Sequence, residues 1–210
     1  MLKINPGVKN SKILKDKGRM IVNVAIKRFI YYGIAKTTMD DIAKDLALTK
    51  PSLYYYYSNK SHLVRAVFDH VFAEYLSLLQ ALPLNQSLEK ILDDVIKIQW
   101  KLFKHYALLG YSTTFLFNAK DKILQHKFFE VKMSHIAFLT QVFQAASRSN
   151  TTTYTNIDQL VHLYFSCMQG LLWNHIVDKQ TLIPTHYRQH IIVYKNARNL
   201  SSVFVKGISL

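Results

Sequence analysis

The chain has 210 residues, half of them hydrophobic, and its 27 lysines and arginines against 13 aspartates and glutamates give a formal net charge of +14. The large apolar fraction excludes wholesale disorder, and the single cysteine excludes an internal disulfide framework. Six glycines and four prolines are too few for a turn-dense β-sandwich or barrel. The positive charge favours nucleic acid as a partner, or less often an acidic membrane surface.

The basic residues are concentrated at the N-terminal end of the chain. Residues 1–60 contain 12 basic and 4 acidic side chains, a net charge of +8, and the rest of the chain contributes +6. Residues 1–17 are polar and lysine-rich, so we expect no signal peptide. The uncharged stretch 159–177 contains polar residues that would be costly in a bilayer. We therefore expect a cytoplasmic protein without a membrane partner.

Apolar residues recur at three- and four-residue spacings through nearly the whole chain, which predicts an all-α fold of about nine helices. Expected near the N-terminus are a helix over 19–32 that ends at Gly33, two short helices and a long helix over 59–82. Thr38 with Asp41 resembles a capping box, and Thr49 and Asn59 are further N-cap candidates. Later helices are expected over 87–106, 108–118, 121–148, 156–178 and 185–206, with a loop at 147–156.

Three short helices within a basic segment of about sixty residues suggest an N-terminal helix-turn-helix domain over 1–60. The second helix of the motif would start at Thr49 and contain Leu53 on its core side and four consecutive tyrosines. Steps of 100° spread the tyrosines around the helix, so some are exposed and can donate to phosphates. Runs of tyrosine also occur in hydrophobic cores and in protein interfaces. The run alone therefore does not distinguish these roles from contact with DNA.

Residues 20–63 resemble the DNA-binding domain of the TetR family of bacterial transcriptional regulators. The resemblance is carried by Phe29 and Gly33, Thr37-Thr38, Asp41-Ile42-Ala43, the run Leu53-Tyr54-Tyr55-Tyr56-Tyr57, and Lys60. Two departures have structural consequences. Ala47 replaces a turn glycine, so the turn must avoid positive φ or accept strain. Tyr56 and Tyr57 replace His and Phe, and an inward-packed Tyr57 must find a partner for its hydroxyl.

The resemblance implies a set of DNA contacts in and around the second helix of the motif. These are Thr37, Thr38, Thr49, Lys50, Pro51, Ser52, Tyr54, Tyr55, Tyr56 and Lys60. Thr37 or Thr38, Tyr55 and Lys60 are expected on phosphates; Lys50 is expected at a base edge or a phosphate. The basic residues Lys3, Lys9, Lys12, Lys15 and Lys17 form either a minor-groove arm or a solvated tail.

Beyond residue 65 the resemblance is architectural and implies that 61–210 is a helical ligand-binding and dimerisation domain. The aromatic-rich candidates for an apolar or weakly anionic aromatic effector are Trp100, Phe103, Tyr106, Phe115, Met133, Phe138, Tyr164 and Met168. The candidates for a dimer interface are Leu160, Leu171, Leu172, Val193, Ala197, Leu200 and Phe204. Both sets of side chains could equally pack in the core of one subunit.

No arrangement of residues points to an enzyme, a cofactor or a metal site. His186 and His190 have metal-ligand spacing but no evident third ligand, Cys167 is expected to be a buried thiol, and Asp93 and Asp94 should point to different sides. We expect a ligand-responsive homodimer, usually a repressor, on a palindromic double-stranded DNA operator. The alternatives are a basic helical protein that binds anionic membranes and a DNA-binding dimer without an effector.

Overall fold

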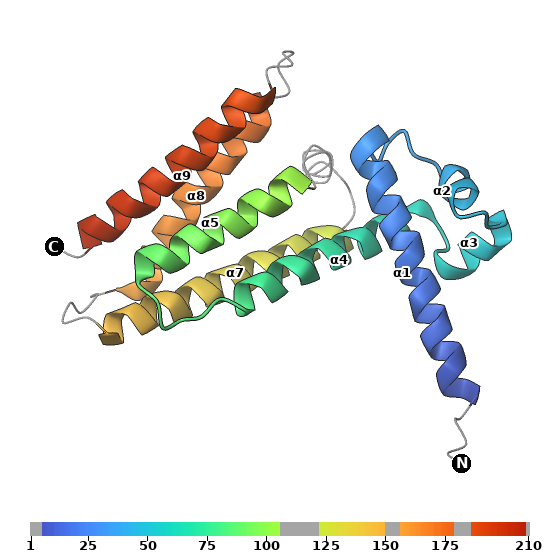
Figure 1. The fold of residues 1–210 in the computed structure, drawn as a ribbon, viewed down its shortest axis with the longest axis horizontal. Helices are drawn as coiled ribbons and strands as arrows, with labels where there is room; N and C mark the ends of the chain where they lie inside the picture. The colour runs from blue at the N-terminus through green and yellow to red at the C-terminus, as the bar shows by residue number, and fades with distance from the viewer. Residues whose placement is uncertain (1–5, 106–121, 150–155, 179–185, 209–210) are drawn as a thin grey trace. The chain divides into compact units, whose positions relative to one another are not determined.

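A computed structural model describes residues 6–105, 122–149, 156–178 and 186–208, with side chains described except at 6–15, 103–105, 149, 172–178 and 186–193. The regular elements of these residues are all α-helices, which confirms the predicted fold class (Figure 1). They are α1 (Pro6–Tyr32), α2 (Met39–Asp45), α3 (Lys50–Tyr56), α4 (Lys60–Gln80), α5 (Leu88–His105), α7 (Lys122–Ser149), α8 (Ile157–Asp178) and α9 (His186–Ile208). The predicted helix over 108–118 lies outside the described residues.

The first helix is longer than the sequence pattern predicts. It begins at Pro6 instead of residue 19, so the segment with Lys9, Lys12, Lys15 and Lys17 is helical and not an extended tail. Proline suits a first helical position, because its missing N–H would have no partner there. The polar residues of this extension carry no apolar stripe, which is why periodicity located only the second half of α1. Similarly, α7 continues to Ser149, into the predicted loop.

The described residues belong to two compact units, Met1–Ala73 with Tyr106–Leu124 and Glu74–His105 with Gln125–Leu210. The division falls within α4, whereas the predicted domain boundary lies between residues 60 and 61. In the first unit α2 packs against both α1 and α3. Its core is made by apolar side chains from α1 to α4, namely Ile21, Val22, Ala25, Ile26, Phe29, Ile34, Met39, Ile42, Ala43, Leu53, Leu63, Val64, Val67 and Phe68.

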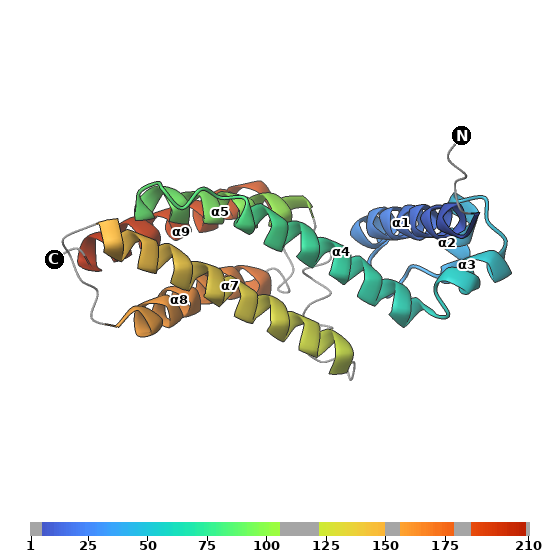
Figure 2. The ribbon, with the colours of Figure 1, turned by 90° about the horizontal axis from the view of Figure 1, so that it is seen from below.

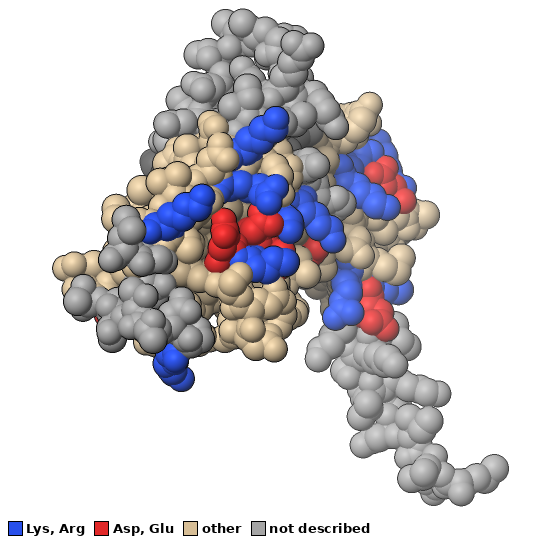
Figure 3. Space-filling view, turned by 60° about the vertical axis from the view of Figure 1, so that its left-hand side comes forward, with Lys and Arg blue, Asp and Glu red and all other residues tan. Residues whose placement is uncertain are grey.

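The second unit is a bundle in which α9 packs against both α5 and α8 (Figures 1 and 2). Its core takes side chains from α4, α5, α7, α8 and α9, among them Leu79, Leu92, Leu139, Phe143 and Tyr164. The charged surface in Figure 3 shows acidic side chains gathered among lysines and arginines. No helix among the described residues is long and apolar enough to cross a membrane.

Candidate nucleic-acid interface

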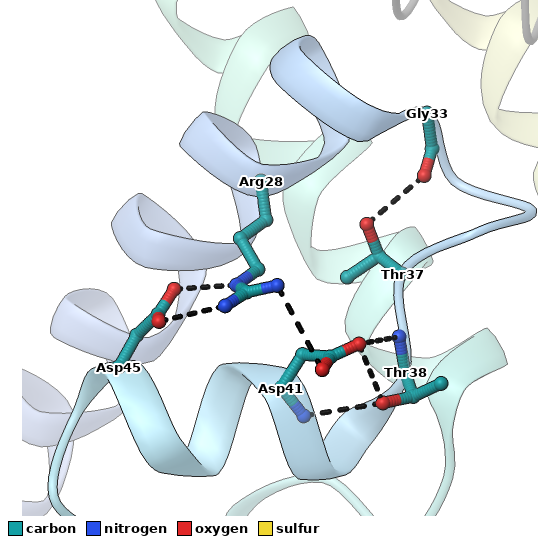
Figure 4. Close-up of polar contacts among 6 residues, drawn as sticks. All are labelled: Arg28, Gly33, Thr37, Thr38, Asp41 and Asp45. Carbon is teal, nitrogen blue, oxygen red and sulfur yellow. Dashed lines mark hydrogen bonds and ion pairs between the residues drawn. The ribbon is translucent and has the colours of Figure 1, made fainter.

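The N-terminus of α2 is closed by the predicted capping box (Figure 4). The Asp41 backbone N–H donates to Thr38 Oγ1 at 3.1 Å, and the Thr38 backbone N–H donates to Asp41 Oδ2 at 2.9 Å. The Thr38 hydroxyl also donates to Asp41 Oδ2, and this bond together with that from the Thr38 backbone N–H holds the pKa of Asp41 below its usual range. The cap satisfies backbone donors that would otherwise lack a partner, so it fixes where α2 starts.

Arg28 joins α1 to the other end of α2 (Figure 4). Its Nε and Nη2 donate to the two carboxylate oxygens of Asp45 at 2.5 and 2.8 Å, and Nη1 lies 3.8 Å from Asp41 Oδ1. The hydrogen bonds to Asp45 raise the pKa of Arg28 and lower that of Asp45. The two-pronged geometry fixes direction as well as distance, so α2 is held on α1 at both of its ends.

The turn between α2 and α3 contains the one described non-glycine residue with positive φ, Ala47 at +50°. The Leu48 N–H donates to Ala43 O at 2.9 Å and the Ala47 N–H donates to Lys44 O at 3.1 Å. This is the bonding pattern of a Schellman motif, in which the residue after the cap adopts a left-handed conformation and is usually glycine. Of the two outcomes expected for Ala47, the turn therefore accepts the strain.

We expect Ala47→Gly to raise the free energy of unfolding by about 1 kcal/mol, because a left-handed alanine costs ~1–2 kcal/mol and the freer unfolded glycine offsets part of the gain. The matched control is Gly33→Ala, since Gly33 has φ +81° and open space around an added Cβ. That change should lower stability by about 1 kcal/mol. Urea unfolding measures both, and a destabilised Ala47→Gly variant would contradict the strain.

The candidate recognition helix, α3, is anchored by one side chain and presents the others outward. Thr49 is its N-cap and accepts from the Ser52 N–H at 3.4 Å, and the exposed Pro51 lies in the first turn, as predicted. Leu53 is completely buried. Tyr54 is exposed, Tyr55 is 74 % exposed and Tyr56 is half-buried, with the rings of Tyr55 and Tyr56 in edge contact at 5.4 Å.

The Tyr57 hydroxyl has the hydrogen-bond partner that its inward packing requires. Its side chain is half-buried, and its hydroxyl donates to the backbone carbonyl of Gly18 on α1 at 3.2 Å. Burial raises the pKa of the Tyr57 hydroxyl, so it remains a donor. The bond ties the end of α3 to α1, which a phenylalanine at this position would not do.

The two adjacent threonines before α2 have different surroundings. Thr38 is exposed and its hydroxyl donates to Asp41 Oδ2 at 2.7 Å. Thr37 is only 1 % exposed, and its hydroxyl donates to Gly33 O at 3.0 Å (Figure 4). The expectation that Thr37 contacts DNA is therefore corrected to a structural role, the bracing of the α1–α2 loop, and Thr38 is the phosphate candidate.

The two lysine candidates also differ in their surroundings. Lys50 is exposed, lies over the Tyr54 ring at 6.0 Å and forms an ion pair with Asp40 at 3.0 Å, which raises the pKa of Lys50. Lys60 opens α4 and its Nζ donates to the backbone carbonyl of Ala35 at 3.2 Å. Partial burial lowers the pKa of Lys60. Lys60 is thus positioned by the fold, whereas a phosphate at Lys50 must compete with Asp40.

Residues 21–67 match the model of the bacterial regulatory proteins of the tetR family. The match contains both helices of the motif, the turn and Lys60. Over this segment the chain is similar to the DNA-binding part of the tetR family.

Known proteins of this kind resemble the chain beyond the motif. The biofilm operon icaADBC negative transcriptional regulator IcaR of Staphylococcus epidermidis is 29 % identical over 119 residues, 56 % of this chain and 63 % of that protein. The match therefore spans less than two thirds of that regulator.

Two solved structures show the same fold over most of the chain. A transcriptional regulator from Cytophaga hutchinsonii is 23 % identical with a TM-score of 0.78, over 91 % of this chain and 97 % of that one. FadR from Bacillus subtilis, in complex with stearoyl-CoA, is 13 % identical with a TM-score of 0.64, over 86 % and 95 %.

Those effector candidates whose side chains the structure describes do not line one common cavity. Phe138, Tyr164 and Met168 are buried in the core of the second unit, Trp100 stacks on Tyr194 at 5.5 Å, and Met133 is 44 % exposed. Phe103, Tyr106 and Phe115 lie outside the described side chains. A ligand site at these residues stays a prediction.

Most described dimer candidates lie in or against the core of the second unit. Ala197 is buried in that core, and Leu160, Leu171, Leu200 and Phe204 pack against it, while Leu172 and Val193 lie outside the described side chains. Among the described side chains of α8 and α9, the large apolar ones that are exposed are Leu163 and Val203. A dimer contact at the predicted residues stays a prediction.

Three other expectations can be compared with the structure. Cys167 is half-buried, not fully buried. Asp93 and Asp94 do not diverge, because both form ion pairs with Lys97, at 2.7 and 3.0 Å. His186 and His190 lie on α9, but their side chains are not among those described.

Proposed function

We propose that the protein is a sequence-specific DNA-binding transcriptional regulator that acts in the cytoplasm as a homodimer on a palindromic operator. The observation that carries the proposal is α3, which is short, capped and anchored by a buried Leu53, and which exposes Pro51, Tyr54 and Tyr55. Such a helix can enter the major groove while its supports hold its angle. The bonds from Arg28 and Tyr57 to neighbouring elements supply those supports.

The DNA contacts we propose are divided by chemistry. Thr38, Tyr55 and Lys60 are hydroxyl and ammonium donors at the edges of the motif and suit phosphates. Thr49, Ser52 and Tyr56 on or beside α3 suit base edges or the sugar-phosphate backbone near them. Lys50 can contact either once it exchanges Asp40 for DNA.

The test of the proposal is selection of bound fragments from genomic DNA by the full-length chain. We expect enrichment of a palindrome with half-sites about 34 Å apart or at a related spacing, because a two-fold dimer presents two copies of α3. Enrichment without any shared sequence would contradict sequence-specific binding. Equal binding to anionic vesicles and DNA would favour a general polyanion-binding role.

Lys60→Gln should weaken binding to all DNA and reduce the magnitude of the salt slope by about 0.9 for each subunit bound, because one phosphate contact is lost. Glutamine keeps a hydrogen-bond donor for Ala35 O, so the local fold is preserved. The control is Lys101→Gln, which removes the same charge from an exposed position on α5. Slopes measured by fluorescence anisotropy that fall equally in both variants would reduce the role of Lys60 to overall charge.

We further propose that the protein is a repressor released by a small molecule. Support comes from the relatives: IcaR is named a negative regulator, and the FadR neighbour was solved with stearoyl-CoA. Helix α4 supports a route for the response, because it contributes Leu63 and Val67 to the core of the first unit and Leu79 to that of the second. A ligand that shifts α4 would change the spacing of the two α3 helices, and ~1–3 kcal/mol of coupling would suffice.

A further inference from the structure

A polar cavity of about 520 Å³ lies between α5 and α9 in the second unit. Every residue that lines it is polar or charged: Ser87, Glu89, Lys90, Asp93, Lys195, Arg198, Asn199, Ser201 and Ser202. Its volume is within the range of small-molecule sites, but its lining is unlike the apolar lining typical of such sites. A lining of this kind favours a polar ligand.

Arg198 is held at the cavity wall by contacts on two sides. Its Nε forms an ion pair with Asp93 Oδ1, and its guanidinium lies over the ring of Tyr194, 5.8 Å from the centroid. Tyr194 in turn stacks on Trp100. The ion pair uses Nε, so the two terminal Nη groups of Arg198 remain available as a fork of donors.

The charge of the cavity is positive once the ion pairs are taken into account. Asp93 is balanced twice, by Arg198 and by Lys97, whose Nζ is 2.7 Å from Asp93 Oδ2. Lys97 Nζ also contacts Asp94 Oδ1 at 3.0 Å, and its hydrogen bonds to the two carboxylates raise the pKa of Lys97. Lys195 forms no ion pair with any residue that the structure describes. Lys90 is a third cation of the lining, and its Nζ forms an ion pair with Asp94 Oδ2. With Glu89 and Asp93 included, the lining residues carry a net charge of +1.

Neutral hydrogen-bonding groups complete the lining. Ser87, Asn199 and Ser202 contribute two hydroxyls and an amide. The buried Ser201 shares a hydrogen bond with the Tyr164 hydroxyl at 2.7 Å and so joins the wall to α8. Glu89 supplies an acceptor for ligand hydroxyl or amino groups at the N-terminal end of α5.

We propose that the α5–α9 cavity binds a small molecule that carries a phosphate monoester and hydroxyl or amino groups. The guanidinium fork of Arg198 with Lys195, and with Lys90 once it exchanges Asp94 for the ligand, matches the two charges and three oxygens of a phosphate better than the single charge of a carboxylate. Binding requires only the second unit. Any effect on operator release rests on the proposed function and would act through α9 and the Ser201–Tyr164 bond.

The test is isothermal titration of the full chain, without DNA, with ribose 5-phosphate, AMP, inorganic phosphate and citrate. We expect ribose 5-phosphate or AMP to bind with a Kd of about 1 mM or tighter, and more tightly than citrate. Arg198→Gln and Lys195→Gln should each weaken that binding at least about tenfold, since each removes a charged donor. Arg198→Gln leaves Asp93 paired with Lys97, so the bundle keeps its fold.

Two control variants separate this site from other sources of phosphate affinity. Lys101→Gln removes an exposed charge from α5 outside the lining, and Lys60→Gln removes a proposed DNA-phosphate contact. Neither variant should change the titration. No binding by either organophosphate, citrate binding as tight, or equal weakening in the controls would overturn the proposal. Operator binding is measured in a separate experiment. A failure to bind an operator would therefore not affect the interpretation of this titration.

Discussion

The double variant Leu163→Glu/Val203→Glu should sediment as a monomer of 24.4 kDa, whereas the parent chain should sediment at twice that mass. The two side chains are 55 and 68 % exposed on α8 and α9, which pack against each other. Their neighbours Gly170 and Gly207, one turn or two along the same helices, have open space where a Cβ would be. Apolar and small side chains on adjacent helices suit a two-fold contact, and a buried unpaired carboxylate there costs several kcal/mol.

Loss of the dimer should also reduce operator affinity at least about 100-fold, because a single helix-turn-helix reaches one half-site and loses the effective concentration of the second. The matched control is Phe129→Glu/Met133→Glu, which places the same charges on an exposed apolar pair of α7. Helical circular dichroism should be unchanged in both variants, since all four side chains are exposed. Dissociation by the α7 variant alone would place the interface on α7.

Local chemistry explains why much of the motif was predictable. The capping box of Thr38 and Asp41 and the cap at Thr49 depend on residues three positions apart, so the sequence contains both partners. The departure at Ala47 could also be recognised, because a glycine-preferring position restricts φ whatever surrounds it. Tyr57 illustrates the limit: its need for a partner was predictable, but the Gly18 carbonyl lies 39 positions away.

Features that depend on packing between distant segments were not predictable. Helices α8 and α9 are apolar on more than one face, so periodicity could not distinguish the partly buried Leu200, which packs against the core, from the exposed Val203. In the sequence Lys90, Lys195 and Arg198 resemble ordinary surface charges, and only the α5–α9 contact brings them to one cavity. Thr37 and Thr38 are identical neighbours whose roles differ because one side chain turns inward.

The core of the second unit contains a polar cluster that the sequence did not suggest. The Tyr75 hydroxyl from α4 lies 3.0 Å from His135 Nδ1 on α7 and accepts from Gln99 Nε2 on α5 at 3.2 Å. The His135 ring also meets the Phe165 ring of α8 edge-on, at 5.2 Å. Burial lowers the pKa of His135 to about 4 and raises that of Tyr75, so both are neutral near pH 7.

The free energy of unfolding should therefore fall on acidification. The variant His135→Gln should remove the part of this loss that comes from His135. The folded pKa of about 4 lies below the ordinary value of 6.5, so the contribution is complete above pH 6.5 and is lost as pH falls through 4. We expect a loss of about 2 kcal/mol between pH 7.5 and pH 5, near 3 kcal/mol at full protonation. A protonated imidazole donates at both nitrogens, so the Tyr75 hydroxyl would also lose its acceptor.

Urea unfolding at the two pH values gives the loss, which glutamine should abolish because it accepts from Tyr75 without titrating. The exposed His126 provides the control: His126→Gln should retain the parental loss, and an equal loss in His135→Gln would show that His135 is not its source.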